Sequence, residues 1–582
     1  MKFTTLYKGA CMLLLAGISS CNDMLDVTPG DKLTPDTFFK SGNDLELYTN
    51  KFYPNGFPAN SIIEDEADLR IKKDGIKAAV SCQRFVTETS GEWGWGPLRD
   101  INFYLEHSEN CEDAAARAHY DGVARFFRAL FYYNKVTQFG DVPWYTTALA
   151  SDSPELYKPR DSRETVMQNI IADLDYAIAN LPKDRRLYEV TKWTALALKS
   201  RACLFEGTFR KYHKLDGWEP YLELCVSASD DLMRNGGYTI YSAGTQPYRE
   251  LFSSMNAIAD EMILARDFNA SLQLTHSAHQ FIYVPGMAIN GATQRIFKVY
   301  LMKDGSYFSG KPGWEKMEFA DETKDRDPRM AQTFVTPGCM RDGAGELPNL
   351  GIIKLGYQPL KYIGARKYDN TNAENDLPLY RYAEVLLNYA EAKAELGSLT
   401  QADIDRSIKL LRNRVNMPNL NMAQANSNPD PALTSAALGY PNVDKGANMG
   451  VILEIRRERT VELFMEGLRY NDLMRWKEGG AISQPFMGMY FPGAGEYDLD
   501  GDGTNDVYLY EGSGGVSGCA TRLRIGSDIT LSEGDKGFCL VHSAIPHQWN
   551  EERDYLYYIP SKERVLNPSL TQNPGWNDGL GY

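Results

Sequence analysis

The feature that most constrains this fold is a run of apolar stripes at helical spacing, joined by short links. Residues 112–139 place large apolar side chains on one face, and Gly140 and Pro143 then stop the helix. Residues 162–181 repeat the pattern and end before Pro182. Helices of this kind must bury their apolar faces against one another, so the pattern predicts a mainly α fold.

Two more helices are expected directly afterwards. One runs from about residue 191 to 204, and the other covers about 219–234 and ends at Gly236-Gly237. The short links between the four helices predict antiparallel neighbours. Asp161 and Glu164 have the spacing of a capping box, so Asp161 is expected to cap the helix that follows it.

A later stretch, Arg381–Val415, resembles a tetratricopeptide repeat. Small and large apolar residues alternate along its first helix, Gly397 closes that helix, and Ala402 helps to open the next. Helix pairs of this kind bury their faces only by stacking on one another. The sequence therefore predicts a tetratricopeptide-like helical-repeat scaffold.

Long segments without helical period interrupt this scaffold. Residues 238–365 and 482–546 are rich in Gly, Pro and aromatic residues, a composition typical of loops and short strands. We expect the function to reside in these insertions. The expected parts are an N-terminal helical part (21–237) and a second part (238–582), which contains a loop-rich insertion (238–365), repeat helices (376–478) and a C-terminal segment (479–582).

The first 20 residues have the layout of a signal peptide. Two lysines precede a short apolar run, Ala10–Ile18, which is too short for a stable membrane span. The following Ile-Ser-Ser-Cys resembles the lipobox of bacterial lipoproteins, in which the Cys sulfur takes a diacylglycerol. We therefore expect Cys21 to be lipidated and to anchor the chain at the outer membrane, because several acyl chains make a durable anchor. The alternative is a secreted protein with an ordinary cleavage site.

Charge and cysteine usage exclude several classes of function. The net charge is −15, and no basic cluster is present, so a nucleic-acid partner is not expected. The nine cysteines are scattered without a C-x-x-C pair, so the sequence predicts neither a zinc site nor a disulfide framework.

Seven motifs occur in one order along the chain, and together they resemble the SusD/RagB family of outer-membrane lipoproteins of nutrient-scavenging Bacteroidota. They cover nearly all of the mature chain, from CNDMLDVTPGD after the leader to YYIPSKERVLNPSLTQNPGW near the end. Between these two lie RFFRALFYYNKVTQFGDVPWY (125–145) and the segments 173–182, 190–207, 379–397 and 452–479.

The resemblance implies a capture protein that is not an enzyme and needs no cofactor. Members of the family act as the lid of a TonB-dependent, SusC-like barrel in the outer membrane. They bind an oligosaccharide, or in some branches a peptide, and deliver it for import. Sugar C–H faces lie on aromatic rings while hydroxyls bond to Asp, Asn and Arg, and two or three rings must converge to hold a ligand.

One charge-rich helix could be mistaken for acid–base machinery. It carries opposite charges at i+3 and i+4, which predicts helix support or an ion-pair network against neighbouring helices. We interpret this set as structural: Glu458, Arg459, Glu462, Glu466, Arg469, Asp472 and Arg475.

Candidate ligand contacts come from the irregular segments. In GEWGWG, Trp93 is expected at the surface, and Trp95 is expected either in the core or at the ligand. Trp93 and Trp314 are predicted to share one carbohydrate platform, because both lie in Gly-rich segments that can turn a ring outward. The other candidates are Asp68, Arg70, Tyr283, Asn290, Tyr300 and Tyr307, and local packing is the alternative for each aromatic residue.

The segment DLDGDGTND (Asp498–Asp506) follows the spacing of a calcium loop. Its oxygen ligands would come from Asp498, Asp500, Asp502, Thr504 and Asp506 around a hard cation, with Gly503 at the bend. Position 12 of such a loop should be Glu, and here it is Leu509. A structural Ca²⁺ ion is one interpretation, and an Asp-Gly turn between two strands is the other.

Two rival classes of function remain open at this stage. An extracellular glycoside hydrolase would need two carboxylates about 5–9.5 Å apart across an aromatic cleft. A repeat scaffold that binds only protein would have helix grooves without a cluster of exposed rings. The arrangement of rings and carboxylates in the folded chain discriminates among the three.

Overall fold

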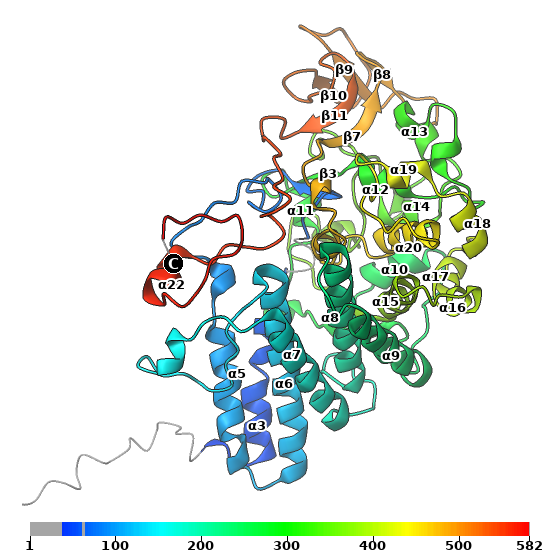
Figure 1. Cartoon of the computed structure of the whole chain (residues 1–582). Coiled ribbons are helices and arrows are strands. Elements are labelled where there is room, and N and C mark those ends of the chain that lie inside the picture. Colours follow the sequence, from blue (N-terminus) through cyan, green and yellow to red (C-terminus); the bar gives the residue numbers. More distant parts are fainter. Residues whose placement is uncertain (1–37, 61–64, 581–582) are drawn as a thin grey trace, which may run out of the picture.

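The computed structural model describes residues 38–60 and 65–580, and in it helices dominate (Figure 1). The helices of the N-terminal part are α3 (Gly42–Thr49), α4 (Phe52–Gly56), α5 (Gly96–His107), α6 (Ala114–Phe139), α7 (Arg163–Asn180), α8 (Lys192–His213) and α9 (Glu219–Asn235). The four helices predicted from the apolar stripes correspond to α6, α7, α8 and α9, and α6 packs on α7 while α8 packs on α9. The mainly α prediction is confirmed.

The predicted cap of α7 is wrong by one residue. Ser162, not Asp161, is the N-cap, and its side chain accepts a hydrogen bond from the Thr165 amide at 3.2 Å. The Asp161 carboxylate instead accepts from the Trp144 amide at 2.7 Å and pairs with the Lys158 ammonium at 2.7 Å. Asp161 therefore fastens the loop that precedes α7.

The repeat-like stretch folds as α15 (Tyr382–Glu395), α16 (Gln401–Asp405) and α17 (Ile408–Asn413). The α15 helix packs against α8, α9 and α20 (Met449–Glu462), as a stacked repeat requires. The second helix of the repeat is divided into α16 and α17 at Ser407. The backbone of Ser407 leaves the helical region, and its hydroxyl donates to the Asp403 carbonyl at 2.6 Å. The remaining helices are α10 (Pro247–Ser253), α11 (Gln280–Tyr283), α12 (Gln294–Val299), α13 (Phe319–Glu322), α14 (Arg329–Thr333), α18 (Met422–Ser427), α19 (Pro431–Thr434), α21 (Arg469–Arg475) and α22 (Ser561–Leu566).

The charge-rich set belongs to a buried ion-pair network, as its spacing predicted, but the prediction of a single helix is wrong. Helix α20 ends at Glu462, and Arg469, Asp472 and Arg475 lie on the separate helix α21. Glu462 accepts from the guanidinium groups of Arg414 at 2.7 Å, Arg381 at 2.8 Å and Arg329 at 3.0 Å. All four side chains are almost fully buried, and a buried charge is tolerated only when it is paired. The set therefore joins α20 to α14, the segment before α15 and the end of α17.

Small sheets occupy the irregular segments. The antiparallel pairs are β1 (Arg70–Lys72) with β3 (Ile289–Ala292), β2 (Met262–Arg266) with β6 (Leu377–Arg381), β4 (Met340–Arg341) with β5 (Ala344–Gly345), and β7 (Phe486–Phe491) with β11 (Gly537–Val541). A three-stranded sheet contains β8 (Gly495–Tyr497), β9 (Val507–Tyr510) and β10 (Thr521–Arg524). This sheet lies at one end of the molecule and α3 at the other (Figure 1). The division of the chain at residue 237 stays a prediction.

Candidate ligand-binding cleft

A cleft of about 470 Å³ opens where four segments meet. They are the 3₁₀ helix η1 (Gly91–Trp93), the start of α5, the loop 143–157 and α22. In Figure 1, α22 lies beside the upper end of α5. The volume lies in the range of sites for small molecules. The lining residues are Trp93, Trp95, Gly96, Leu98, Arg99, Asn102, Pro143, Tyr145, Thr147, Leu149, Ser151, Leu156, Tyr157, Glu563, Leu566, Asn567 and Leu570.

Aromatic rings converge on this cleft. The partly exposed Trp95 ring meets Tyr145 edge to face, with centroids 5.6 Å apart, and meets Trp93 in the same way at 5.3 Å. Beneath them, the Lys135 ammonium lies 5.3 Å from the centre of the Trp95 ring and donates to the Glu92 carbonyl. Burial lowers the pKa of Lys135 to about 8. Lys135 thus fixes η1 and the ring above it.

Side chains of α5 and α6 hold the loop that forms one wall. Buried Asn102 donates from its amide to the Tyr145 carbonyl at 3.0 Å and to the Thr147 carbonyl at 3.1 Å. The Tyr145 amide donates to the Tyr132 hydroxyl at 2.6 Å. These bonds fix the backbone of the loop at Tyr145, and a fixed backbone reduces the ordering cost of binding.

The other wall comes from the C-terminal segment. The Asn567 side-chain amide donates to the carbonyls of Leu156 at 3.1 Å and Lys158 at 2.9 Å, so α22 is tied to the loop 143–157 and its extension. The Ser561 amide donates to the Thr87 carbonyl at 3.0 Å. Farther along, Asn573 donates to the Phe139 carbonyl at 2.9 Å. Residues 554–576 therefore close the cleft over the N-terminal helices.

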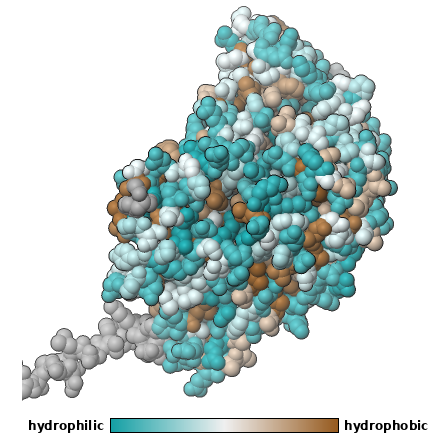
Figure 2. Space-filling view, in the orientation of Figure 1, coloured by the Kyte–Doolittle hydropathy of each residue, from teal (hydrophilic) through white to brown (hydrophobic). Residues whose placement is uncertain are grey.

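The rim of the cleft is apolar and exposed. Tyr157 is 56% exposed and Leu566 is 58% exposed. Figure 2 shows hydrophobic side chains gathered over the position of α22. Among the described residues that line the cleft, Glu563 is the one carboxylate, so the pair that glycoside hydrolysis requires is not assembled there.

The prediction that Trp93 lies at the surface is wrong. Trp93 lines the cleft but is only 4% exposed, and its ring packs edge to face on Phe139 at 4.8 Å. The tight turn of η1 carries this ring inward and leaves Trp95 as the more accessible of the two.

The predicted platform of Trp93 and Trp314 is not formed either. Trp314 does not line the cleft. Its ring packs against Phe308 at 6.1 Å, and its carbonyl accepts from Lys298 at 2.8 Å. The middle insertion therefore places Trp314 in a local contact of its own.

Four other predicted ligand contacts are buried. Asp68 pairs with the guanidinium groups of Arg469 at 2.7 Å and Arg295 at 2.9 Å. The remaining three are Arg70, in strand β1, Asn290, in strand β3, and Tyr300, which packs against Phe334. Each of the four is less than 5% exposed, so it offers no free surface to a ligand and the prediction is wrong for all of them.

Tyr283 and Tyr307 are partly exposed but lie outside the cleft. The Tyr283 hydroxyl donates to Glu346, and the Arg341 guanidinium lies 4.7 Å from its ring centre. The Tyr307 hydroxyl donates to the Asn428 carbonyl at 3.0 Å. These contacts correspond to local packing, the alternative given for such aromatics.

Sequence reasoning missed the loop and the helix that complete the cleft. The missed residues are Arg99, Tyr145, Tyr157, Leu566 and Asn567. One signal was available for the loop, because VPWYTTALASDSPELY combines aromatics and prolines between two strong helices. The local sequence of α22 does not predict that this helix lines the cleft, since its contacts there are with residues more than 400 positions away in the chain.

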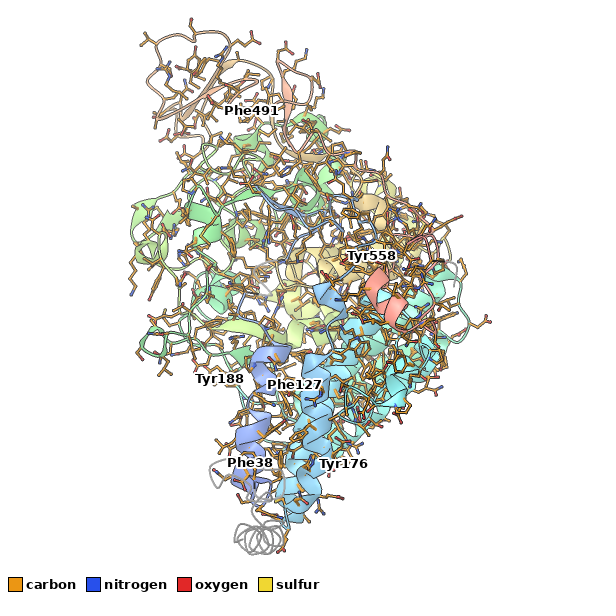
Figure 3. The ribbon with its side chains drawn as sticks, turned by 90° about the vertical axis from the view of Figure 1, so that its left-hand side faces the viewer. Phe38, Phe127, Tyr176, Tyr188, Phe491 and Tyr558 are labelled. Atoms are coloured by element: carbon orange, nitrogen blue, oxygen red, sulfur yellow. The ribbon has the colours of Figure 1, made fainter. Side chains whose placement is uncertain are left out.

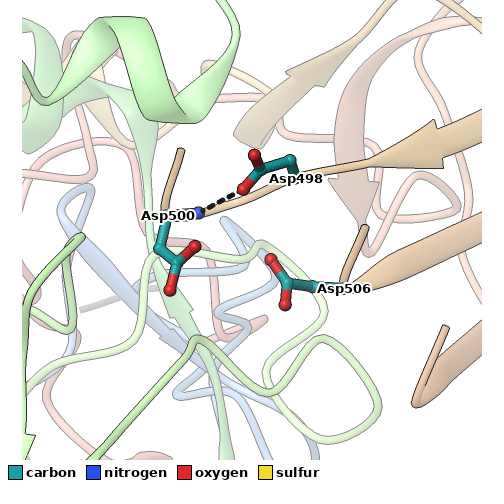
Figure 4. A group of neighbouring side chains, drawn as sticks. All are labelled: Asp498, Asp500 and Asp506. Atoms are coloured by element: carbon teal, nitrogen blue, oxygen red, sulfur yellow. Dashed lines mark hydrogen bonds between the residues drawn. The ribbon is translucent and has the colours of Figure 1, made fainter. Parts of the chain in front are cut away.

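The acidic loop forms a separate cluster (Figure 4). Carboxylate oxygens of Asp498, Asp500 and Asp506 all lie within 4.8 Å of one another. Asp498 also accepts from the amides of Gly501 at 2.7 Å and Gly503 at 2.8 Å. Burial and the neighbouring carboxylates Asp500, Asp498 and Asp502 raise the pKa of Asp506.

One predicted calcium ligand, the Asp502 carboxylate, does not join this cluster. Instead, the Thr504 amide donates to the Asp502 carboxylate at 2.7 Å, a contact within the turn. The loop connects antiparallel strands β8 and β9, as the alternative of an Asp-Gly turn predicted.

Cys21 lies outside the described residues, so its lipidation stays a prediction. Among the helices of residues 38–60 and 65–580, none combines the length and apolar character that a membrane crossing needs.

Comparison with known proteins gives one consistent result. A family model described as "SusD family" matches residues 261–576, and one described as "Starch-binding associating with outer membrane" matches residues 70–204. SusD-like protein P38 of Formosa agariphila is 22% identical over 516 residues, which cover 82% of this chain and 92% of the relative.

Solved structures share the fold at low identity. A SusD-like carbohydrate-binding protein from Bacteroides fragilis superposes with a TM-score of 0.68 at 20% identity, covering 92% of this chain and 100% of the other. A protein described as a laminarin-binding SusD-like protein gives a TM-score of 0.55 at 16% identity, with 92% and 100% coverage.

Proposed function

Because the chain belongs to the SusD family, we propose that it captures oligosaccharides at the cell surface and delivers them to a TonB-dependent, SusC-like transporter of the outer membrane. In this proposal Cys21 carries the lipid anchor. The protein binds its ligand without cleaving it and needs no cofactor to do so.

The observation that carries the proposal is the convergence of three partly exposed or exposed rings, Trp95, Tyr145 and Tyr157, on one cleft. A ring stack adds roughly 0.5–1.5 kcal/mol beyond burial, so several rings are needed to approach the about 8 kcal/mol of a micromolar complex. Arg99, Glu563 and Asn567 supply donors and acceptors beside the rings. The description of one structural neighbour as laminarin-binding supports a saccharide ligand.

A peptide ligand is the second candidate. Arg99 and Glu563 carry opposite charges in the lining of the same cleft, an arrangement that could receive the two charged ends of a short peptide. Neutral oligosaccharides would gain nothing from this pair of charges beyond ordinary hydrogen bonds.

The test is isothermal titration of the purified chain with a panel of neutral oligosaccharides and short peptides. Tyr157→Ala should weaken binding of the preferred ligand about ten-fold, the equivalent of one lost stack, and leave the melting temperature nearly unchanged. Tyr188→Ala is the matched control, because Tyr188 is also an exposed tyrosine, at 40%, but does not line the cleft. If the wild type and Tyr157→Ala bind the preferred ligand with equal affinity, the ligand does not bind in this cleft.

Delivery to a transporter needs its own test. We expect a mild-detergent pull-down of the lipidated protein to recover a barrel protein of the outer membrane. Cys21→Ala should release the chain from membranes. Recovery of no barrel protein from membranes that retain the wild-type chain would contradict the partnership.

A further inference from the structure

The outer face of the three-stranded sheet β8–β9–β10 carries tyrosine rings beside exposed arginines. We propose that this face is a second saccharide-binding surface, specific for anionic glycans that carry carboxylate or sulfate groups. This face is separate from the cleft, and binding there does not depend on a sugar in the cleft.

Strand register places five side chains on this face. Glu496 of β8, Tyr508 of β9 and Arg522 of β10 lie side by side across the three strands. Tyr510 and Arg524 form the next cross-strand pair along β9 and β10. Residues opposite one another and residues two apart point to the same side of a sheet. The alternate positions, Val507, Leu509 and Leu523, are buried, so the five-residue face is the outer one.

The two rings are held in fixed orientations. Tyr508 and Tyr510 have ring centroids 5.4 Å apart and planes 28° apart, and both are partly exposed. The Gly515 amide donates to the Tyr508 hydroxyl at 2.9 Å. Gly514, at φ +67°, lies against the Tyr510 ring so closely that a Cβ there would come within 2.6 Å of it. The turn after β9 therefore orders the rings before any ligand arrives.

The arginines of this face are available to a ligand. Arg522 and Arg524 are both exposed, and among the described residues no carboxylate lies within ion-pair distance of either. The Arg522 guanidinium lies 5.6 Å and 5.8 Å from the two ring centres and gives one hydrogen bond, to the Gly515 carbonyl at 2.7 Å. Most of its donors remain free for a carboxylate or sulfate, which guanidinium groups bind in bidentate fashion.

This local positive charge stands out against an acidic chain. The net charge of −15 would repel an anionic polymer at long range, but that repulsion is screened beyond about 8 Å at physiological ionic strength. Contact is therefore decided by the local charges. These are the two guanidinium groups that face solvent on this side of the sheet and the carboxylates of the turn 498–506 that joins β8 to β9. Glu496, the carboxylate of this face, lies across Tyr508 from Arg522 and accepts from Asn505 at 3.1 Å.

The surface is remote from the cleft. Figure 1 shows β8, β9 and β10 at one end of the molecule and α22 at mid-height. In the view turned by 90°, Phe491 of the neighbouring strand β7 likewise lies near that end, and Tyr558 lies at mid-height (Figure 3). A single long polysaccharide could engage both places, and the second contact would then be intramolecular, with a gain in overall affinity.

The experiment uses the full chain and three polymers: polygalacturonate for carboxylate, dextran sulfate for sulfate, and neutral dextran. Affinity electrophoresis in gels containing each polymer should retard the wild type with at least one anionic polymer and not with dextran. The retardation should weaken as salt is added. The double variant Arg522→Gln, Arg524→Gln should reduce the affinity at least ten-fold, and Tyr510→Ala should reduce it as well.

Arg234→Gln is the matched control, because Arg234 is an exposed arginine on α9, far along the chain, and should leave the retardation unchanged. Tyr157→Ala separates the two sites. If Tyr157→Ala abolishes retardation while the arginine variant keeps it, the anionic glycan binds in the cleft and the sheet proposal is overturned. Absence of retardation of the wild type by both anionic polymers would overturn it too. A preference for one polymer assigns the anion as carboxylate or sulfate.

Discussion

At the scale of single residues, the carboxyl group of Glu478 is unusual because it is buried with incomplete compensation. It is 3% exposed, accepts from the Asn442 amide at 2.9 Å and lies 3.5 Å from the Arg456 guanidinium. Arg456 itself is surrounded by the rings of Tyr212 and Trp476 at 4.8 Å and 4.6 Å. Burial raises the pKa of Glu478 to about 7.

This pKa predicts a dependence of stability on pH. The folded-state pKa lies above the ordinary value of 4.5, so the folded state favours the protonated form. The resulting stability is fully present below about pH 4.5 and is lost as pH rises through 7. Glu478→Gln keeps an acceptor for the Asn442 amide but cannot ionise. It should therefore be more stable than wild type at pH 8, by up to about 3 kcal/mol, and similar at pH 4.5.

Denaturant unfolding of both proteins between pH 4.5 and 8 measures this difference. Glu155→Gln, at an exposed position, is the control and should follow the wild type. Parallel pH profiles for wild type and Glu478→Gln would contradict the assignment.

Residue-level prediction from sequence had a clear limit in GEWGWG. The glycines indicated that a tryptophan could be turned outward, and both Trp93 and Trp95 do line the cleft. Which ring faces inward is decided by the direction of η1 and by the packing of Phe139 on Trp93, and neither is encoded in the six residues. Likewise, Asp68 and Arg70 have the side chains of a binding site but lie in the core.

At the scale of elements, helices were predictable wherever the apolar period was long. The observed bounds of α6 and α9 agree with the bounds predicted from the sequence within about two residues. A long apolar stripe defines each helix, and a glycine directly after it marks the C-terminal end. The second helix of the repeat was less predictable, since the Ser407 hydroxyl satisfies a backbone carbonyl and allows the helix to break.

The turn between β8 and β9 gives an element-scale prediction. We propose that Asp498, Asp500 and Asp506 hold a Ca²⁺ ion, because three carboxylates this close favour a bound cation. Saturating Ca²⁺, at about 100 times its dissociation constant, should stabilise the loop by roughly 2.7 kcal/mol. Hydrogen exchange of residues 498–509 should then slow in Ca²⁺ relative to chelator.

Asp498→Asn should abolish the effect of Ca²⁺ on exchange, since Asp498 both belongs to the cluster and accepts two loop amides. Asp535→Asn, at an exposed site in the turn before β11, should retain it. Identical exchange in Ca²⁺ and chelator for the wild type would show that the segment is only a turn.

At the scale of the whole molecule, the ion-pair network around α20 joins segments that are far apart in sequence. The neighbouring guanidinium groups lower the pKa values of Glu458, Glu462 and Glu466 despite their burial. Their stabilisation is therefore present above about pH 4.5 and is lost as pH falls below it. We expect the protein to unfold in acid at a pH where each of these carboxylates must take up a proton.

Glu462→Gln tests the network directly. It removes one charge that three arginines share, and it should reduce the free energy of unfolding by about 3–5 kcal/mol at neutral pH. The control is Glu189→Gln, which breaks the exposed pair with Arg186 and should change stability by less than about 1 kcal/mol. Equal losses in the two variants, measured by urea unfolding, would contradict a dominant role for the buried pairs.

Fold class and family membership were predictable at this scale, because seven motifs keep their order along the chain. The cleft was only half predictable. Its η1 wall follows from a local motif, but the α22 wall depends on contacts such as that between Asn567 and Leu156, which are separated by 411 residues. Pairing at that distance leaves no periodic signal in the sequence.

The dependence of the cleft on α22 has a consequence for how the protein is made. A chain leaves the ribosome from its N-terminus, so η1, α5 and the loop 143–157 are synthesised long before residues 554–576. Until those residues arrive, Trp95 and Tyr145 face an open groove without its second wall. A complete cleft is thus a property of the completed chain. A product shortened near residue 550 would still contain Cys21, the predicted lipidation site, but would lack the wall that α22 supplies.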